Sequence, residues 1–262
     1  MVGPILAAHR ALAQRAGLEP LAWQLRGLPV CASTELELER WLRQRPPPAN
    51  CSPGAAALRW PRAVIARRQR FGHGQQGRSW LSPPGGIWLS AALPWPADPT
   101  RAAAPGLAVL VALAAELARL GVPLRLKWPN DLMLITAAGP RKLAGLLPGL
   151  RLRAGVVRWA RIGIGLNGSN PVPLGGGNLR GLPRARSSQL AVLAARVLLA
   201  LDQAMLLASQ PEAVRIQAEQ LLLLPASPLA LEGEAWWPLG LAGDGGLRLG
   251  HADGRLRTLR RF

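Results

Sequence analysis

The spacing of apolar and polar residues along this 262-residue chain predicts a series of strands interrupted by helices. Short apolar segments that end at glycine, proline or charged residues are typical of strands. Strands are expected at residues 23–32, 63–66, 86–93, 124–128, 132–136, 142–147 and 156–166. The fourth and fifth of these flank a Pro-Asn-Asp turn at residues 129–131, so we expect them to form a hairpin.

Amphipathic stretches with helical spacing lie between and after these strands. Helices are expected at residues 34–44, 107–117 and 187–208 and from Pro211 onward, with a loop at residues 50–54. Thr34 and Glu37 stand at the spacing of a capping box at the start of the first helix. Gly121 suits the end of the second helix, and Ser187 is a suitable cap for the third.

The sequence pattern changes from helical spacing to short strand-like segments after Pro225. These apolar segments alternate with Asp-Gly pairs at 244–245 and 253–254. Asp-Gly pairs are hairpin signals. We therefore expect a small β-barrel over residues 225–262 that depends on a larger domain, residues 1–224, for its stability. In the larger domain two helices follow the strands, which favours the α+β class, a mixed sheet with helices packed on it.

Composition excludes several classes of protein. Apolar residues make up 49% of the chain, and every apolar stretch of membrane-spanning length contains a charge or a proline, which argues against a disordered tail and a simple membrane span. Cys31 and Cys51 form no zinc or disulfide pattern, and the three histidines are scattered singly. Residues 1–17 are rich in Ala and Arg, but so is the whole chain, so we expect no targeting signal and a cytoplasmic protein.

The net charge of +18 depends almost entirely on arginine. Of 32 basic residues, only Lys127 and Lys142 are lysines. Because a compact ammonium and a planar guanidinium are not interchangeable, these two lysines are candidates for function. A non-enzymatic nucleic-acid binder is the alternative that the charge suggests, but the arginines run through every segment instead of clustering.

A glycine-rich segment at residues 72–77 matches the G-x-G-x-x-G pattern. A dinucleotide-binding site requires a helix directly after this pattern, whereas here two prolines follow at 83–84. The segment is therefore predicted to be a loop that lets backbone approach a ligand closely, flanked by Gln69, His73 and Arg78. The alternative is a surface loop with incidental glycines.

Residues 127–131, Lys-Trp-Pro-Asn-Asp, combine a rare lysine with a rare carboxylate. Between Asp98 and Asp202 the only acids are Glu116 and Asp131. In such a positive field we expect Asp131 to have a cationic or metal partner, either Lys127 or a nucleotide-bound Mg²⁺. The alternative is that Asn130 and Asp131 are ordinary turn formers.

Two later strands carry further candidates. Arg141 and Lys142 are adjacent, so one cation is expected to point inward toward an anion while the other reaches solvent. Gly163 and Gly165 fall on one face of a strand that ends at Asn167. Glycine inside a strand indicates either a flat organic ligand lying across the backbone or a β-bulge.

These residues form no convincing Ser/His/Asp set, thiol nucleophile or metal cluster. Positioning and charge stabilisation are therefore favoured over covalent catalysis by the protein. Attack of a substrate carboxylate on the α-phosphate of a nucleotide needs cations, a magnesium partner and a shielding loop. Ser33 and Thr34 add short hydrogen-bond donors at the start of a helix.

Four motifs together resemble those of biotin protein ligases. Residues 72–80 resemble G-R-G-R-x-G-R-x-W, 127–132 are K-W-P-N-D-L, 141–146 are similar to R-K-L-A-G-I, and 163–167 to G-I-G-I-N. The resemblance is close over about residues 28–170. It implies the class II synthetase and biotinyl/lipoyl ligase type of fold with an SH3-like C-terminal barrel. It also implies a reaction in which biotin and ATP give biotinyl-5′-AMP, and a lysine of a biotin carrier domain then takes the biotin.

The resemblance also assigns residues. Biotin would be bound by Ser33, Thr34, Gln69, Gly72, His73, Gly74, Gln75, Lys142, Gly163 and Gly165. ATP would be bound by Arg78, Trp80, Lys127, Asn130, Asp131 and Asn167. Lys142, Arg78 and Asp131 would be catalytic, with Lys142 stabilising charge on the α-phosphate. Magnesium would be held by the ATP phosphates, with Asp131 as the candidate protein ligand.

The chain departs from the family pattern at several positions. His73 and Gln75 stand where arginines are usual, and Ala32 and Glu35 flank Ser33-Thr34 where aspartate and asparagine are common. The missing arginine at 75 predicts a faster leak of activated biotin. Only about 32 residues precede Ser33, so we expect a form without the N-terminal DNA-binding domain of some relatives, acting as a monomer or weak homodimer and binding neither DNA nor membrane. A lipoate ligase, which shares the fold and chemistry, is the alternative enzyme.

Overall fold

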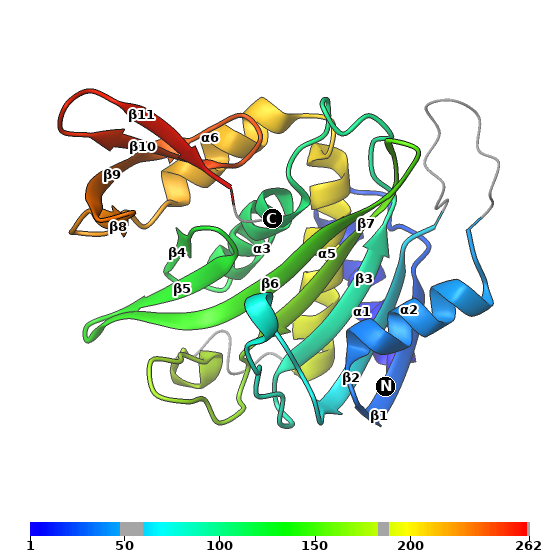
Figure 1. Ribbon diagram of the computed structural model, residues 1–262. Coiled ribbons are helices and arrows are strands. Elements are labelled where there is room, and N and C mark those ends of the chain that lie inside the picture. The colour runs from blue at the N-terminus through cyan, green and yellow to red at the C-terminus, as the bar shows by residue number, and fades with distance from the viewer. Residues whose placement is uncertain (48–59, 183–188, 261–262) are drawn as a thin grey trace.

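The computed structural model describes residues 1–47, 60–182 and 189–260, and its main feature is a mixed sheet (Figure 1). The strands are β1 (Gln24–Cys31), β2 (Arg62–Gln69), β3 (Ile87–Leu93), β4 (Leu124–Lys127), β5 (Asp131–Thr136), β6 (Gly139–Arg153) and β7 (Val156–Leu166). Their order is β1-β2-β3-β7-β6-β5-β4. β1 runs parallel to β2, and the other neighbours are antiparallel, so the predicted α+β class with a mixed sheet is confirmed.

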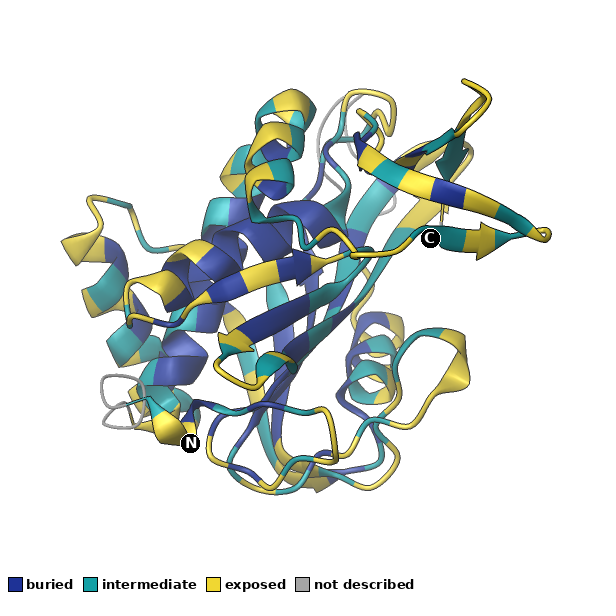
Figure 2. Cartoon of the chain, turned by 90° about the vertical axis from the view of Figure 1, so that its left-hand side faces the viewer, coloured by how far each residue is buried: buried dark blue, intermediate teal, exposed yellow. Residues whose placement is uncertain are grey.

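Helices α1 (Val2–Arg15), α3 (Pro105–Ala118) and α5 (Leu190–Leu207) cover one face of the sheet. Their apolar residues and alternate residues of β3 and β7 form the main core. Helix α2 (Thr34–Gln44) lies on the other face, where Leu38 and Trp41 pack against Val64 and Ala92. Because α2 covers only the β2–β3 end of this face, the sheet beside it is left for the loops that form the site (Figure 2).

Helix α5 is long and apolar enough to cross a membrane by length and composition alone, but 56% of it is buried inside the fold. It also carries a buried polar contact. Asp202 accepts a hydrogen bond from Trp23 Nε1 at 2.8 Å, and its other oxygen lies 2.6 Å from His9 Nε2. Asp202 thereby joins α5 to α1 and to the segment before β1.

The C-terminal strands form a separate small sheet. They are β8 (Leu229–Leu231), β9 (Glu234–Leu241), β10 (Leu247–His251) and β11 (Leu256–Leu259), in the order β11-β10-β9-β8. The Asp-Gly pairs lie at the two predicted hairpin turns. The prediction of a barrel is wrong for the described residues, because β8 and β11 do not pair and the sheet stays open. A three-residue β8 is too short to close it.

This small sheet shares its core with the main domain. Its residues Trp236, Leu241, Leu247 and Leu249 belong to the same apolar cluster as α3 and α5. Helix α6 (Pro211–Leu221) begins at the predicted proline and lies beside β9, where Glu219 Oε1 accepts a hydrogen bond from the Leu241 amide at 2.7 Å. The sheet is therefore anchored by both apolar and polar contacts.

The structure corrects the local predictions at two points. Ser33, and not Thr34, caps α2, because its hydroxyl accepts a hydrogen bond from the Glu35 amide while Thr34 is already helical. The N-terminal segment, from which no structure was predicted, forms α1, with Ile5 and Ala13 buried. Two further predictions, the loop at 50–54 and the cap at Ser187, lie outside the described residues, and α5 begins after Gln189.

Candidate active site

The glycine-rich segment forms a short hairpin between β2 and β3. The Gly74 amide donates to Arg78 O and the Trp80 amide donates to Gly72 O, each at 2.8 Å. Its only helical part is a 3-10 turn, η1 (Gln75–Gly77), where Gln76 and Gly77 have positive φ angles. The absence of a following helix agrees with our rejection of a dinucleotide-binding fingerprint.

The Lys-Trp-Pro-Asn-Asp segment forms the turn between β4 and β5, and two side chains fix it in place. Asn130 Nδ2 donates to Leu146 O at 2.6 Å, which ties the turn to β6. Trp128 Nε1 donates to Gly245 O at 2.9 Å, which ties it to the small C-terminal sheet. Asn130 therefore makes the structural contacts of a turn former in addition to lining the cavity.

Asp131 has a cationic partner, as expected, but it is Lys142 and not Lys127, which was one of the two candidates. Lys142 Nζ lies 2.8 Å from Asp131 Oδ1, in an ion pair whose side chains are 37% and 16% exposed. The reason is a register shift where β5 pairs with β6, since Asp131 lies opposite Gly145 while Met133 lies opposite Lys142. The extra residue forms a β-bulge that turns Lys142 to the same face as Asp131.

Trp80 explains the glycines in β6 and β7. Gly145 and Gly165 lie opposite each other, and the indole of Trp80 covers both. A Cβ on Gly165 would lie 2.4 Å from Trp80 Cε2, and one on Gly145 would lie 2.9 Å from Trp80 Cζ3. In this structure the flat group over Gly165 is the indole of Trp80, whereas Gly163 is not covered by it, and both glycines line the cavity. The bulge alternative is wrong, because the pairing of β7 is regular on both sides of residues 163–165.

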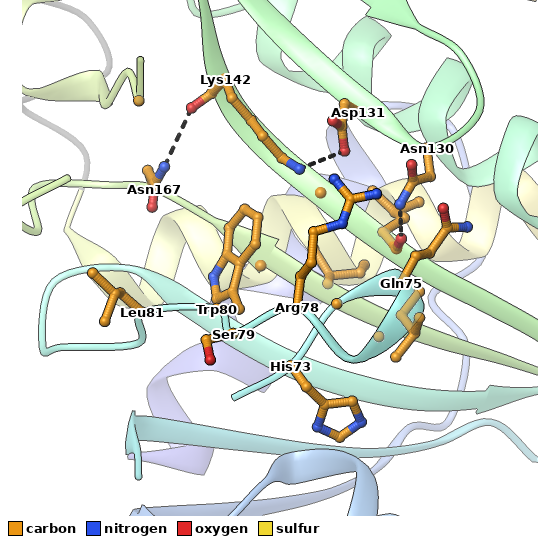
Figure 3. A pocket seen from close by; sticks show the side chains of 18 of the residues that line it. His73, Gln75, Arg78, Ser79, Trp80, Leu81, Asn130, Asp131, Lys142 and Asn167 are labelled. Atoms are coloured by element: carbon orange, nitrogen blue, oxygen red, sulfur yellow. Dashed lines mark hydrogen bonds and ion pairs between the residues drawn. The ribbon is translucent and has the colours of Figure 1, made fainter. Parts of the chain in front are cut away.

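The ammonium of Lys142 also lies 5.1 Å from the centre of the Trp80 ring. This distance is within the range of a cation–π contact. Figure 3 shows the Arg78 guanidinium turned toward the Lys142–Asp131 pair from the glycine-rich loop. Three charged side chains from β5, β6 and the glycine-rich loop are therefore gathered at one end of the cavity.

The other end of the cavity is polar. Gln69 Oε1 accepts hydrogen bonds from the backbone amide of Thr34 at 2.8 Å and from its hydroxyl at 3.0 Å. The same hydroxyl lies 2.8 Å from Ser90 Oγ, and Gln69 Nε2 donates to Ser82 Oγ at 2.9 Å. These hydroxyl and amide groups form a fixed network where α2, β2 and β3 meet.

Both ends belong to one cavity of about 630 Å³. Of the residues assigned from the sequence, those that line it are Ser33, Thr34, Gln69, His73, Gly74, Gln75, Arg78, Trp80, Lys127, Asn130, Asp131, Lys142, Gly163, Gly165 and Asn167. Gly72 is not among the lining residues. A Cβ there would lie 2.6 Å from Ser82 Oγ and from Trp80 O, so the glycine is needed for packing inside the loop.

The sequence analysis missed several lining residues. Ser90 belongs to the end around Thr34 and Gln69, Glu35 adds a carboxylate there that is paired with Arg161, and Pro173, Leu174, Gly175 and Gly176 line the cavity from a loop after β7. That loop pairs with Lys142, whose amide donates to Gly175 O at 3.0 Å and whose carbonyl accepts from the Gly177 amide at 2.9 Å. The run of three glycines at 175–177 was the signal that could have indicated it.

Asn167 is buried at the end of β7 and makes contacts within the protein. Its Nδ2 donates to Lys142 O at 3.4 Å, and its Oδ1 accepts from Asn170 Nδ2 at 3.0 Å. These contacts tie the end of β7 to the backbone of Lys142. They give Asn167 a part in holding the strand that carries the lysine.

Part of this chain is similar in sequence to known proteins. Residues 55–167 match the biotin/lipoate A/B protein ligase family. The bifunctional ligase/repressor BirA of Salmonella typhimurium is 40% identical over 114 residues, which are 42% of this chain and 34% of that protein. BirA of Escherichia coli is 40% identical over 109 residues, 40% of this chain and 32% of that protein. The matched part spans about a third of the length of these curated relatives.

Similar solved structures cover most of the chain. The biotin protein ligase of Aquifex aeolicus in complex with biotin and ATP has a TM-score of 0.64 and 21% identity, over 90% of this chain and 95% of that one. The biotin acetyl coenzyme A carboxylase synthetase of Helicobacter pylori with bound biotinylated ATP has a TM-score of 0.57 and 20% identity, over 90% and 100%. The chain therefore has the fold of these ligases, and its residues 55–167 are similar to the biotin/lipoate A/B protein ligase family.

Proposed function

We propose that this chain is a biotin protein ligase, which activates biotin with ATP and transfers it to a lysine of a biotin carrier protein. The observation that carries the proposal is a single cavity with a charged end, formed by Lys142, Asp131 and Arg78, and a polar end around Thr34 and Gln69. A nucleotide phosphate suits the first end and the ring of biotin suits the second. Relatives with biotin and ATP bound support the choice of ligands.

In the first step, a carboxylate oxygen of biotin forms a bond to the α-phosphorus of ATP while the bond to the leaving pyrophosphate breaks. Negative charge grows on the α-phosphate oxygens during this exchange. The ammonium of Lys142, held by Asp131 at 2.8 Å, is positioned to stabilise that charge. Arg78 and Lys127 add positive charge around the phosphates without forming a covalent bond.

In the second step, the amine of the carrier lysine attacks the carbonyl carbon of biotinyl-5′-AMP, and AMP leaves. The amine forms an amide and loses a proton. This step needs a bound, activated acyl group and access for the carrier, and it needs no nucleophile from the protein. The net positive charge of +18 would favour the approach of an acidic carrier domain.

Magnesium enters this proposal as part of the ATP substrate. Asp131 and Glu35 are the carboxylates among the described residues that line the cavity, and no group of three or more His, Cys, Asp or Glu side chains gathers in the described parts of the chain. A magnesium ion bound mainly by phosphates needs only one or two carboxylates from a protein. Asp131, beside Lys142, fits that need, and Glu35 belongs to the opposite end.

We also propose a division of the chain into two parts. Residues 1–224 would form the catalytic unit, and residues 225–262 would support it through the contact of Gly245 with Trp128 in the cavity wall. A protein that uses ATP to modify a carrier would work in the cytoplasm. These assignments rest on the function proposed above.

A lipoate ligase is the second candidate, because the family that matches residues 55–167 includes lipoate ligases. The deciding experiment is exchange of labelled pyrophosphate into ATP by the purified chain, with biotin or lipoate as the acid. Exchange that depends on biotin supports the biotin ligase proposal. Exchange that depends only on lipoate would show instead that the chain is a lipoate ligase. Incubation with ATP, Mg²⁺, biotin and a carrier domain, with the carrier weighed by mass spectrometry, tests the complete reaction.

A further inference from the structure

The glycine-rich loop is attached to α2 by an ion pair between two residues that depart from the family pattern. His73 Nε2 lies 2.6 Å from Glu35 Oε2. Figure 3 shows the ring of His73 turned away from Lys142, Asp131 and Arg78, on the other side of the loop. His73 therefore does not belong to the phosphate end of the cavity.

Glu35 has a second cationic partner. Its other oxygen lies 2.7 Å from Arg161 Nη1 of β7, and the same nitrogen lies 2.6 Å from Glu39 Oε1. The side chain of Glu35 is only 13% exposed and lines the cavity. An unpartnered carboxylate in this wall would repel a carboxylic acid substrate, but Arg161 and His73 contact both oxygens of Glu35, and Arg161 supplies a compensating charge.

The other contacts of the loop with the fold come from its backbone and from Trp80: the Phe71 amide donates to Ala32 O at 2.9 Å, and the Trp80 indole covers Gly145 and Gly165. Phe71 and Leu81, at its two ends, are 71% and 64% exposed, so the apolar side chains there contribute little packing. Arg78 donates to Gln76 within the loop itself. Among the described residues, the pair with Glu35 is the only ion pair that links residues 71–81 to the rest of the fold.

We propose that His73 is a positioning residue that fastens the glycine-rich loop to α2 through Glu35, so that the cavity is formed before a substrate binds. The loop carries Trp80 and Arg78, and both face the Lys142–Asp131 pair. Loss of the pair would let the loop move away from α2 and would leave part of the charge of Glu35 uncompensated. Substrate would then have to order the loop as it binds, at a cost in affinity.

The test of this attachment is hydrogen–deuterium exchange of the Gly74 and Trp80 amides in the ligand-free protein. Both amides are hydrogen-bonded within the loop. In His73→Gln we expect exchange to become roughly threefold to tenfold faster, as for the loss of a partly buried ion pair. His73→Arg places a permanent positive charge opposite Glu35 and should restore the protection, whereas Arg70→Gln, at an exposed position three residues earlier, should not alter it.

Equal protection in the wild type and in His73→Gln would overturn the proposal. Faster exchange in His73→Gln that His73→Arg fails to correct would also overturn it, because the contact with Glu35 would not be what holds the loop. Glu35→Gln is a second variant that removes the pair from the other side. It should loosen the loop as His73→Gln does, and a protected loop in Glu35→Gln would contradict the proposal.

The consequence for catalysis rests on the proposed function and is measured separately. In His73→Gln the KM for biotin should rise roughly threefold to tenfold while kcat changes by less than about twofold, because the loop is ordered only on binding. His73→Arg should restore the KM. Hydrogen–deuterium exchange of the loop amides tests the contact between His73 and Glu35 even in a protein without biotin-dependent activity. Failure of the proposed function and failure of this inference are therefore distinguishable.

Discussion

Lys142 Nζ lies 2.8 Å from Asp131 Oδ1, and the two residues meet because a β-bulge in β6 turns the lysine toward the strand that carries the aspartate. The pair orients an ammonium that would otherwise have a flexible four-carbon chain. It also supplies the negative charge that allows a lysine to be held in the wall of a cavity with Arg78 and Lys127. The chemistry proposed for the protein depends on this arrangement.

Replacement of Lys142 by arginine should therefore slow adenylate formation by more than about tenfold, since loss of one well-placed stabiliser costs a few kcal/mol. A planar guanidinium cannot take the place of the ammonium beside Asp131 and Trp80. The measurement is biotin-dependent release of pyrophosphate. Arg141→Lys, at a neighbouring position that does not line the cavity, is the matched control, and release at the wild-type rate by Lys142→Arg would refute the role.

Gly165→Ala should displace the indole of Trp80, because the new Cβ would lie 2.4 Å from the ring. Overpacking of this kind costs about 1–3 kcal/mol of folding stability, and movement of Trp80 should also reduce ATP–pyrophosphate exchange. Gly149→Ala in β6 is the control, since the nearest atom to its Cβ is Arg161 Nη2 at 3.6 Å. Equal unfolding midpoints and exchange rates for the two variants would contradict the packing described here.

Gln75 lines the cavity with a neutral amide at the position where the loop motif that the chain resembles has an arginine. The chain should therefore release biotinyl-5′-AMP and label non-carrier proteins in a mixed reaction. Gln75→Arg should reduce this labelling by about tenfold, because hydrogen bonds that involve a charged group are worth roughly 1.5–3 kcal/mol. Complete absence of labelled non-carrier proteins with the wild type would count against the prediction.

Asp202→Ala should destabilise the fold by about 2–4 kcal/mol, because it leaves Trp23 Nε1 and His9 buried without their partner. Urea unfolding measures the change. Asp98→Ala removes a carboxylate that is exposed and bonds only to nearby Thr100, so it should change the stability by less than about 0.5 kcal/mol. Similar effects of the two substitutions would show that Asp202 does not anchor α1 and α5.

Cys31 should react slowly with alkylating reagents. Burial, with a smaller contribution from the negative charge of Glu37, raises the pKa of the Cys31 thiol to about 11. At pH 8 in a Cys51→Ser background, iodoacetamide should react about a hundredfold more slowly with the folded chain than with the urea-unfolded chain, since only the thiolate is reactive. The folded rate should rise with pH toward 11, and equal rates at pH 8 would show that the thiol is not protected.

The features predicted well from the sequence are those with local signals. The strands before residue 170, the start of α6 at Pro211 and the two Asp-Gly turns follow from apolar spacing and from turn residues. The gathering of nearly all assigned residues in one cavity also agrees with the motifs. These features could be predicted because each strand, turn or motif is encoded by the residues of one short segment.

Two of the errors concern contacts between different segments, and one concerns a local helix. The pairing of Asp131 with Lys142 depends on a bulge in β6, and no pattern within either segment reveals which residue is extra. The indole of Trp80 reaches Gly165 across 85 positions, so the glycine alone could not distinguish a side chain from a ligand. The helix at residues 2–15 was missed because its alanines and arginines match the bias of the whole chain.

The most direct test of the central claim follows the oxygen atoms of biotin. Biotin with heavy oxygen in both carboxylate positions is incubated with the chain, ATP, Mg²⁺ and a carrier domain, and the AMP produced is weighed. If the carboxylate attacks the α-phosphorus in the cavity beside Lys142, each AMP carries one heavy oxygen and the carrier amide keeps the other. AMP without heavy oxygen, while the carrier becomes biotinylated, would contradict the account.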